Sequence, residues 1–121
     1  MTTLDILKQA KSAKSELAKL GSEDKNNALL AMADALRENC AAILEENKKD
    51  VEAARGKITD VMIDRLSLDE GRIKGMADGI RDVVKLPDPV GRVLSRVELS
   101  NGLIVEKTAV PMGVVAIIYE S

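Results

Sequence analysis

Apolar residues recur at intervals of three and four through the first half of the chain, the spacing of helices with one buried face. From Thr3 to Leu20 this pattern predicts an amphipathic helix that Gly21 ends. Ser22 is a suitable N-cap for a second helix, which the same spacing carries from Glu23 to Arg55 as one element. The apolar stripe of this second helix consists of Leu29, Ala33, Leu36, Cys40, Ile43, Asn47 and Val51. Because a polar residue interrupts the stripe and the flanking charges show no regular pairing, a core-facing helix is favoured over a coiled coil.

Two shorter helices are predicted after Gly56. Thr59 can cap the first, which continues through Arg65. Ser67 and Glu70 then have the spacing of a capping box, in which the two side chains each satisfy a backbone amide of the first helical turn. We therefore expect the second of these helices to begin at this box.

Glycines recur every fourth residue on one side of that last helix, at Gly71, Gly75 and Gly79. Each glycine costs on the order of 1 kcal/mol relative to alanine inside a helix. The pattern has two interpretations: another backbone approaches this side closely, or the helix is simply weak. Pro87 and Pro89 end the helical part of the chain.

A β-hairpin is predicted over residues 93–108, where alternating and branched residues flank the turn sequence Ser100-Asn101-Gly102. A two-residue Asn101-Gly102 loop would mix apolar and charged side chains on each face. A three-residue loop instead places Gly102 at the left-handed position and sorts the faces. The pairs that this register creates are Leu99 with Leu103, Val97 with Val105, and Arg96 with Glu106.

The run Val114–Ile118 is apolar without interruption, as in a parallel strand that is covered on both faces. The predicted fold class is therefore α/β: an N-terminal helical layer over residues 1–88, a hairpin over 90–110, and a first core strand over 113–121. A parallel strand needs a crossover and a second strand, so we expect the sequence to stop inside a larger, incomplete domain. Ligands in such sheets bind at the carboxyl ends of the strands.

Composition narrows the functional classes. The 121 residues include 18 basic and 20 acidic ones, without a long basic run, which disfavours nucleic-acid binding. No apolar stretch approaches the ~18 residues of a membrane span, and the first residues lack the features of a signal peptide. We therefore expect a cytoplasmic protein of at most one domain. Tyr119 is the only aromatic residue, so the core consists of aliphatic side chains.

The sequence offers little catalytic chemistry of its own. It contains no histidine, which excludes a Ser-His-Asp arrangement and a histidine-ligated metal within these residues. Its single cysteine, Cys40, can form neither an internal disulfide nor a thiolate zinc site. Because Cys40 lies on the apolar stripe between Leu36 and Ile43, we interpret it as a packing residue rather than a nucleophile.

Several stretches, taken in order, resemble one family. They are Asp64-Arg65-Leu66-Ser67-Leu68, Arg72-Ile73-Lys74-Gly75-Met76-Ala77, Leu86-Pro87-Asp88-Pro89-Val90-Gly91, Leu99-Ser100-Asn101-Gly102-Leu103 and Val110-Pro111-Met112-Gly113 with the residues that follow through Ser121. Together they resemble the N-terminal part of the gamma-glutamyl phosphate reductases, which belong to the aldehyde dehydrogenase superfamily. None of these stretches is a catalytic motif, and the resemblance lies in their number and order.

The resemblance implies NADPH-dependent reduction of L-glutamyl 5-phosphate to the 5-semialdehyde with release of phosphate, in proline biosynthesis. It places the catalytic cysteine downstream of this sequence and makes Tyr119, Glu120 and Ser121 the positions nearest to the cofactor or substrate. No glycine-rich dinucleotide fingerprint follows the Val114 strand, in keeping with the superfamily. The superfamily also implies a homo-oligomer in which the hairpin of residues 93–108 crosses to a neighbouring subunit. Because the first helix directly follows Met1, a preceding kinase domain is not expected.

A second class of function is a non-catalytic module whose helices and hairpin serve oligomerisation. A reading frame that continues with a later cysteine would favour the enzyme, and a stop codon after Ser121 the module.

Overall fold

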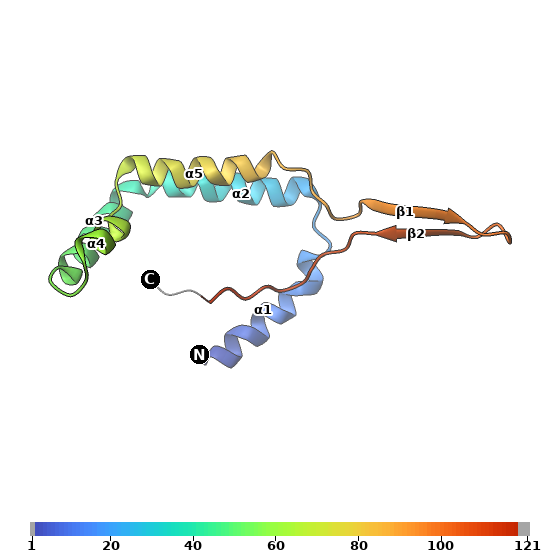
Figure 1. Cartoon of the computed structure of the whole chain (residues 1–121), viewed down its shortest axis with the longest axis horizontal. Coiled ribbons are helices and arrows are strands. Elements are labelled where there is room, and N and C mark those ends of the chain that lie inside the picture. Colours follow the sequence, from blue (N-terminus) through green and yellow to red (C-terminus); the bar gives the residue numbers. More distant parts are fainter. Residues whose placement is uncertain (1, 119–121) are drawn as a thin grey trace. The chain divides into compact units, whose positions relative to one another are not determined.

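A computed structural model describes residues 2–118 and divides the chain into two units, residues 23–86 and the remainder. These residues form five helices and a two-stranded antiparallel hairpin, whose course can be followed in Figure 1. The elements are α1 (Thr3–Leu17), α2 (Ser22–Glu38), α3 (Cys40–Ala54), α4 (Asp60–Leu66), α5 (Glu70–Val84), β1 (Val93–Glu98) and β2 (Ile104–Thr108). Within the described residues, no helix has both the length and the apolar character that crossing a membrane requires.

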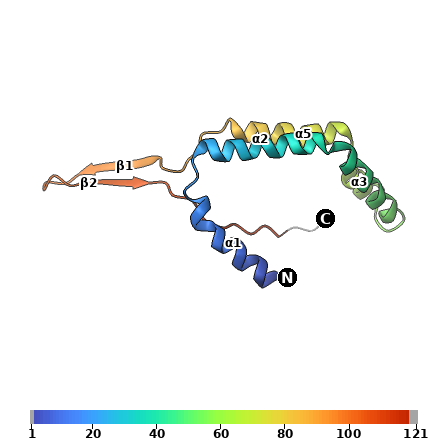
Figure 2. The ribbon, with the colours of Figure 1, turned by 180° about the vertical axis from the view of Figure 1, so that it is seen from behind.

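In the helical unit, α2 and α5 run side by side in opposite directions (Figures 1 and 2). The buried hydrophobic residues of the described chain all lie on these two helices: Ala33 on α2, and Ile73 and Ala77 on α5. At the rim, Arg81 of α5 forms an ion pair with Asp34 of α2 at 2.5 Å. Small side chains and one isoleucine therefore form the core of this unit, as the aliphatic composition predicts.

The prediction of one helix from Glu23 to Arg55 is wrong, because the chain breaks at Asn39 into α2 and α3. Asn39 adopts φ −96° and ψ 12°, and its side-chain amide donates a hydrogen bond to the Ala35 carbonyl at 2.8 Å. Asparagine competes in this way with the backbone for hydrogen bonds and so interrupts helices. The apolar stripe continues across the break, which is why the periodicity did not reveal it.

The predicted capping box at Ser67 is also wrong. Asp69 is the N-cap of α5, and its carboxylate accepts a hydrogen bond from the Arg72 N–H at 2.6 Å. Ser67 instead ends α4, where its hydroxyl donates to the Ile63 carbonyl at 2.7 Å. Aspartate is as good an N-cap as serine, and it lies one residue before the helix, where the cap is needed. Thr59 does precede α4 as its N-cap, although its side chain makes no capping bond.

The first helix begins at Thr3 as predicted but ends at Leu17, three residues early. Its start carries a capping box that the sequence analysis did not anticipate, between Thr2 and Asp5. Hydrogen bonds from the Thr2 backbone and side chain to the carboxylate hold the pKa of Asp5 below its usual value. Asp5 therefore stays ionised at the positive end of the helix dipole, which favours this start.

No other backbone of the described residues closely approaches the glycine side of α5. A Cβ added at Gly75 or Gly79 would meet no atom within 4 Å, and one at Gly71 would meet only the carboxylate of Asp69, at 3.2 Å. Within the described chain, therefore, nothing requires glycine at positions 75 and 79. The interpretation of a close backbone approach gains no support from these residues.

The hairpin register is confirmed. Arg96 pairs with Glu106 and Val97 with Val105, and the Leu99 N–H donates to the Leu103 carbonyl at 2.8 Å. Gly102 occupies the left-handed position with φ 84°. A bulge between residues 93 and 95 shifts the pairing by one residue at the base of β1.

The predicted strand Val114–Ile118 is not formed in this structure, and residues 109–118 contain no strand. A parallel strand exists only when a neighbouring strand satisfies its N–H and C=O groups. In the described residues the only strands are β1 and β2, and they pair with each other. The apolar run therefore lacks the partner that its composition requires.

Candidate functional site

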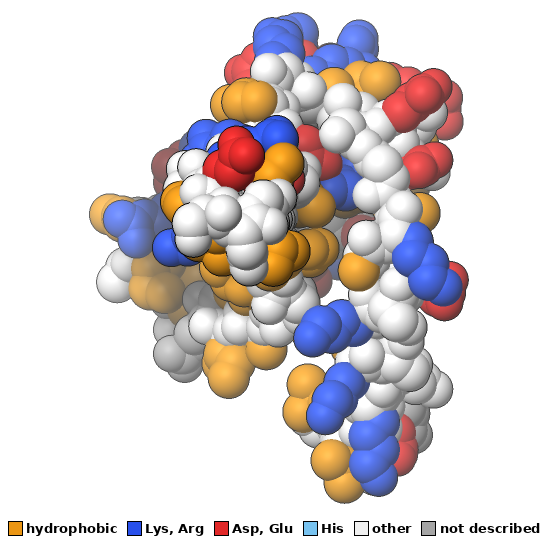
Figure 3. Space-filling view, turned by 90° about the vertical axis from the view of Figure 1, so that its right-hand side faces the viewer, with side chains coloured by type: hydrophobic (Ala, Val, Ile, Leu, Met, Phe, Trp, Pro, Cys, Tyr) orange, Lys and Arg blue, Asp and Glu red, His pale blue; other side chains and the backbone are white. Residues whose placement is uncertain are grey.

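The hairpin presents two different faces. The pairing places Val97, Leu99, Leu103 and Val105 on one face, and their exposed fractions lie between 44% and 59%. The opposite face carries charge, including an ion pair between Arg96 and Glu106 at 3.1 Å. The space-filling view in Figure 3 shows hydrophobic side chains next to charged ones at the surface. We call the four aliphatic residues the apolar hairpin face, and nothing in the described chain buries it.

The segment that leads to the predicted cofactor site lies close to α1. A Cβ at Gly113 would come within 3.3 Å of the Lys14 side chain, so the glycine, at φ 103°, allows this approach. Beyond it the apolar side chains are exposed, to 98% in the case of Ile118. Tyr119, Glu120 and Ser121 lie outside the described residues, so their assignment to the cofactor site stays a prediction.

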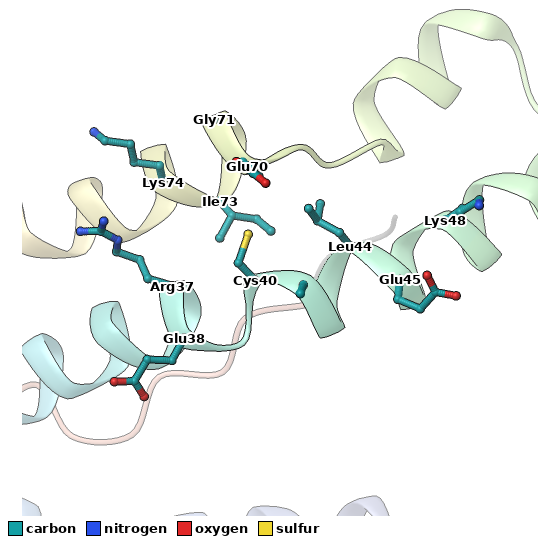
Figure 4. Close-up of a pocket in the computed structure, with 11 residues that line it drawn as sticks. Arg37, Glu38, Cys40, Leu44, Glu45, Lys48, Glu70, Gly71, Ile73 and Lys74 are labelled. Carbon is teal, nitrogen blue, oxygen red and sulfur yellow. The ribbon is translucent and has the colours of Figure 1, made fainter.

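Cys40 lies at the start of α3 in a groove of about 860 Å³ in the helical unit. Figure 4 shows its sulfur directed toward Ile73 of α5. The groove is lined by Arg37, Glu38, Cys40, Ala41, Leu44, Glu45, Lys48, Glu70, Gly71, Ile73 and Lys74. The thiol is free and half-buried. Since the sequence has no histidine to activate a thiol, this environment agrees with a packing role.

A network of charges occupies the rim between α2 and α5. Asp78 accepts a hydrogen bond from Lys74 and lies 3.8 Å from Arg81, which also pairs with Asp34. The hydrogen bond from Lys74, followed by the positive charges nearby, lowers the pKa of Asp78. A carboxyl group with a lowered pKa remains ionised at neutral pH and is a poor general acid. We therefore interpret these charges as an electrostatic link between two helices.

The residues that the structure describes contain no group of three or more Asp, Glu or Cys that could hold a metal ion.

The sequence analysis did not anticipate the hydrogen bonds that Arg72 makes. The Arg72 guanidinium donates to the backbone carbonyls of Asp64 and Ser67 and lies 3.0 Å from the Asp64 carboxylate. Arg72 thereby stabilises the loop that connects α4 and α5. Its separation of eight residues from Asp64 follows no short-range spacing rule, so the sequence alone carried no signal for it.

Comparison with known proteins places the chain in a family. No family model matches it. However, the gamma-glutamyl phosphate reductase of Carboxydothermus hydrogenoformans is 51% identical over 119 residues, which is 98% of this chain. That of Streptococcus pneumoniae strain Hungary19A-6 is 53% identical over 113 residues, or 93% of the chain. The chain belongs to the gamma-glutamyl phosphate reductase family.

Solved structures of gamma-glutamyl phosphate reductases agree with this assignment. The Thermotoga maritima enzyme matches with a TM-score of 0.86 and 34% identity over 89% of this chain. The Saccharomyces cerevisiae enzyme matches with a TM-score of 0.81 and 35% identity over 92% of it. The helices and the hairpin match the N-terminal part of these structures, which confirms the predicted fold class. The chain spans 29% and 27% of the length of the two curated relatives, and 26% and 29% of the two solved chains.

Proposed function

We propose that the chain forms the N-terminal part of an oxidoreductase that uses NADPH to reduce L-glutamyl 5-phosphate to L-glutamate 5-semialdehyde, in L-proline biosynthesis in the cytoplasm. Hydride from the nicotinamide replaces phosphate at the acyl carbon, and phosphate leaves. The observation that carries the proposal is the 51% identity, over 98% of the chain, to a protein named for glutamyl phosphate reduction. A match this extensive covers both units and the loops between their elements.

The role of this chain within the enzyme is structural, with one contact to the cofactor. In the proposal, the helical unit and the hairpin support the catalytic domain, and Tyr119, Glu120 and Ser121 line the NADPH site. The nucleophilic thiolate comes from a later part of the complete polypeptide. The absence of histidine from the sequence and the half-buried position of Cys40 support this division.

A non-catalytic oligomerisation module is the second candidate function. The observation that favours it is the apolar hairpin face, which is fully formed and exposed in the described residues. The reductase and the oligomerisation module differ in one property that can be measured: only a reductase would catalyse a reaction as the complete polypeptide.

The test is an assay of the complete polypeptide that contains this chain. We expect it to reduce NADP⁺ when supplied with glutamate semialdehyde and phosphate, which is the reverse of the proposed reaction. Omission of phosphate serves as the control, because the acyl group must leave as an acyl phosphate. Phosphate-independent turnover, or none, would contradict the proposed reaction, and none would favour the module.

Cys40→Ala should leave turnover of the complete enzyme largely unchanged and lower its stability by about 1 kcal/mol. The reason is that the thiol faces Ile73 in a groove, where it contributes contacts rather than chemistry. Measurement of kcat together with the thermal midpoint separates the two effects. Loss of turnover in a variant that retains its fold would show that the packing assignment is wrong.

A further inference from the structure

Asn47 is the polar member of the α3 stripe, and its side chain joins α3 to the connection between α4 and α5. Its Nδ2 donates a hydrogen bond to the Leu66 carbonyl at 2.9 Å, and its Oδ1 accepts one from the Leu68 N–H at 2.7 Å. The side-chain amide of Asn47 thus satisfies two backbone groups, a carbonyl and an N–H that lie two residues apart. The backbone of a neighbouring β-strand would satisfy such a pair in the same way. In the part of the chain that the structure describes, both hydrogen bonds between α3 and residues 60–69 end on this side chain.

The apolar residues on either side of Asn47 on its stripe are alike in shape and in burial. Ile43 and Val51 lie one turn before it and one turn after it, and both are half-buried. None of the residues of α3 or α4 is fully buried. A slide of α3 by one turn, 5.4 Å, would bring Ile43 or Val51, both β-branched and half-buried, to the position that Asn47 now occupies. The same slide would leave the Asn47 amide and its two backbone partners unpaired, each with a desolvation penalty.

We propose that Asn47 sets the register of α3 against α4 and the start of α5. A polar residue in an apolar seam can select one arrangement by penalising the others, as a single asparagine does in coiled coils. The selected register also determines where Cys40 lies, two turns earlier on α3 beside Ile73 (Figure 4). Asn47 is thus a positioning residue. Its loss should allow α3 to adopt more than one register, with little change in helix content.

The test is Asn47→Leu in the full chain, with Lys49→Leu as the matched control at an exposed position of the same helix. Leucine removes both hydrogen bonds and makes the stripe continuous. We expect helix content to be retained, while hydrogen exchange at the Leu68 amide becomes about tenfold faster or more. Labelling of Cys40, followed on the peptide that contains it so that thiols elsewhere in the complete polypeptide do not contribute, reports on the groove. Labelling should change from one rate to several in Asn47→Leu, and remain a single rate in the control.

Asn47→Ala keeps the test decisive if the leucine variant does not fold. A register role predicts faster exchange at Leu68 with unchanged protection at Ala77, in the core between α2 and α5. Equal loss of protection at both amides would overturn the proposal, because Asn47 would then contribute only to overall stability. A single labelling rate and unchanged Leu68 protection in Asn47→Leu would overturn it as well.

Discussion

Residues 1–121, expressed alone, should catalyse no reduction of L-glutamyl 5-phosphate. Hydride transfer requires a nicotinamide held beside an activated acyl carbon, and in the proposed mechanism a thiolate holds the acyl group. The one thiol of the chain, Cys40, faces Ile73 in a helical groove, and the sequence has no histidine. Relative to the complete enzyme, the loss of a covalent nucleophile and its surroundings removes many orders of magnitude in rate.

Binding of NADPH to this chain alone should be very weak or absent. The segment 114–118, which leads to the predicted cofactor residues, has no strand partner and is exposed. A binding site at the end of a strand is positioned only when the sheet exists. The same exposed run makes the chain prone to self-association, so the measurement needs a monodisperse sample.

The measurement follows NADPH fluorescence and, in the reverse direction, NADP⁺ reduction with glutamate semialdehyde and phosphate. The complete polypeptide, assayed in parallel, is the positive control. Turnover by the 121 residues at a rate comparable to that of the complete enzyme would place the active site within this chain and refute the proposed division of roles.

The sequence was most informative where structure depends on neighbouring residues. The hairpin register follows from the turn glycine and from the sorting of Val97, Val105, Arg96 and Glu106 between two faces. Both determinants lie within sixteen residues, and the same local logic located Thr59 at the start of α4. Short-range patterns were sufficient for these elements because their hydrogen bonds are also short-range.

The sequence was least informative where two interpretations share one local pattern. The α2 and α3 stripes are in phase, so periodicity cannot show that Asn39 breaks the helix between them. Ser67 and Asp69 are both good N-caps, and the choice between them depends on where α4 ends. The apolar run of residues 114–118 has the composition of a strand, but a strand forms only with a partner, and residues 2–118 supply none for it.

The candidate site shows the same limit. Cys40 could be interpreted from its stripe because packing follows helical periodicity. Asn47 was recognised only as an interruption, since its partners Leu66 and Leu68 lie about twenty residues away. Tyr119, Glu120 and Ser121 were assigned by resemblance, and that assignment remains to be tested by substitution in the complete enzyme.

Val97→Asp combined with Val105→Asp should convert the complete reductase from an oligomer toward a monomer. We propose that the apolar hairpin face is covered by a neighbouring subunit, because its four aliphatic side chains are 44–59% exposed here and the outer edges of β1 and β2 are unpaired in the described chain. Burial of one valine contributes ~1.5 kcal/mol or more, so loss of both weakens each interface by ~3 kcal/mol, roughly a hundredfold in Kd. Two carboxylates without partners in the interface weaken it further.

Light scattering coupled to size-exclusion chromatography measures the change in mass. Ser100→Asp combined with Asn101→Asp adds the same charge at the hairpin loop, away from the apolar face, and an aspartate at 101 can still accept the hydrogen bond from the Leu103 N–H. This control should retain the mass of the unmodified enzyme, because it leaves all four aliphatic side chains in place. Equal dissociation of both variants would indicate a general effect of charge. An unchanged mass for the valine variant would show that the apolar hairpin face does not hold subunits together.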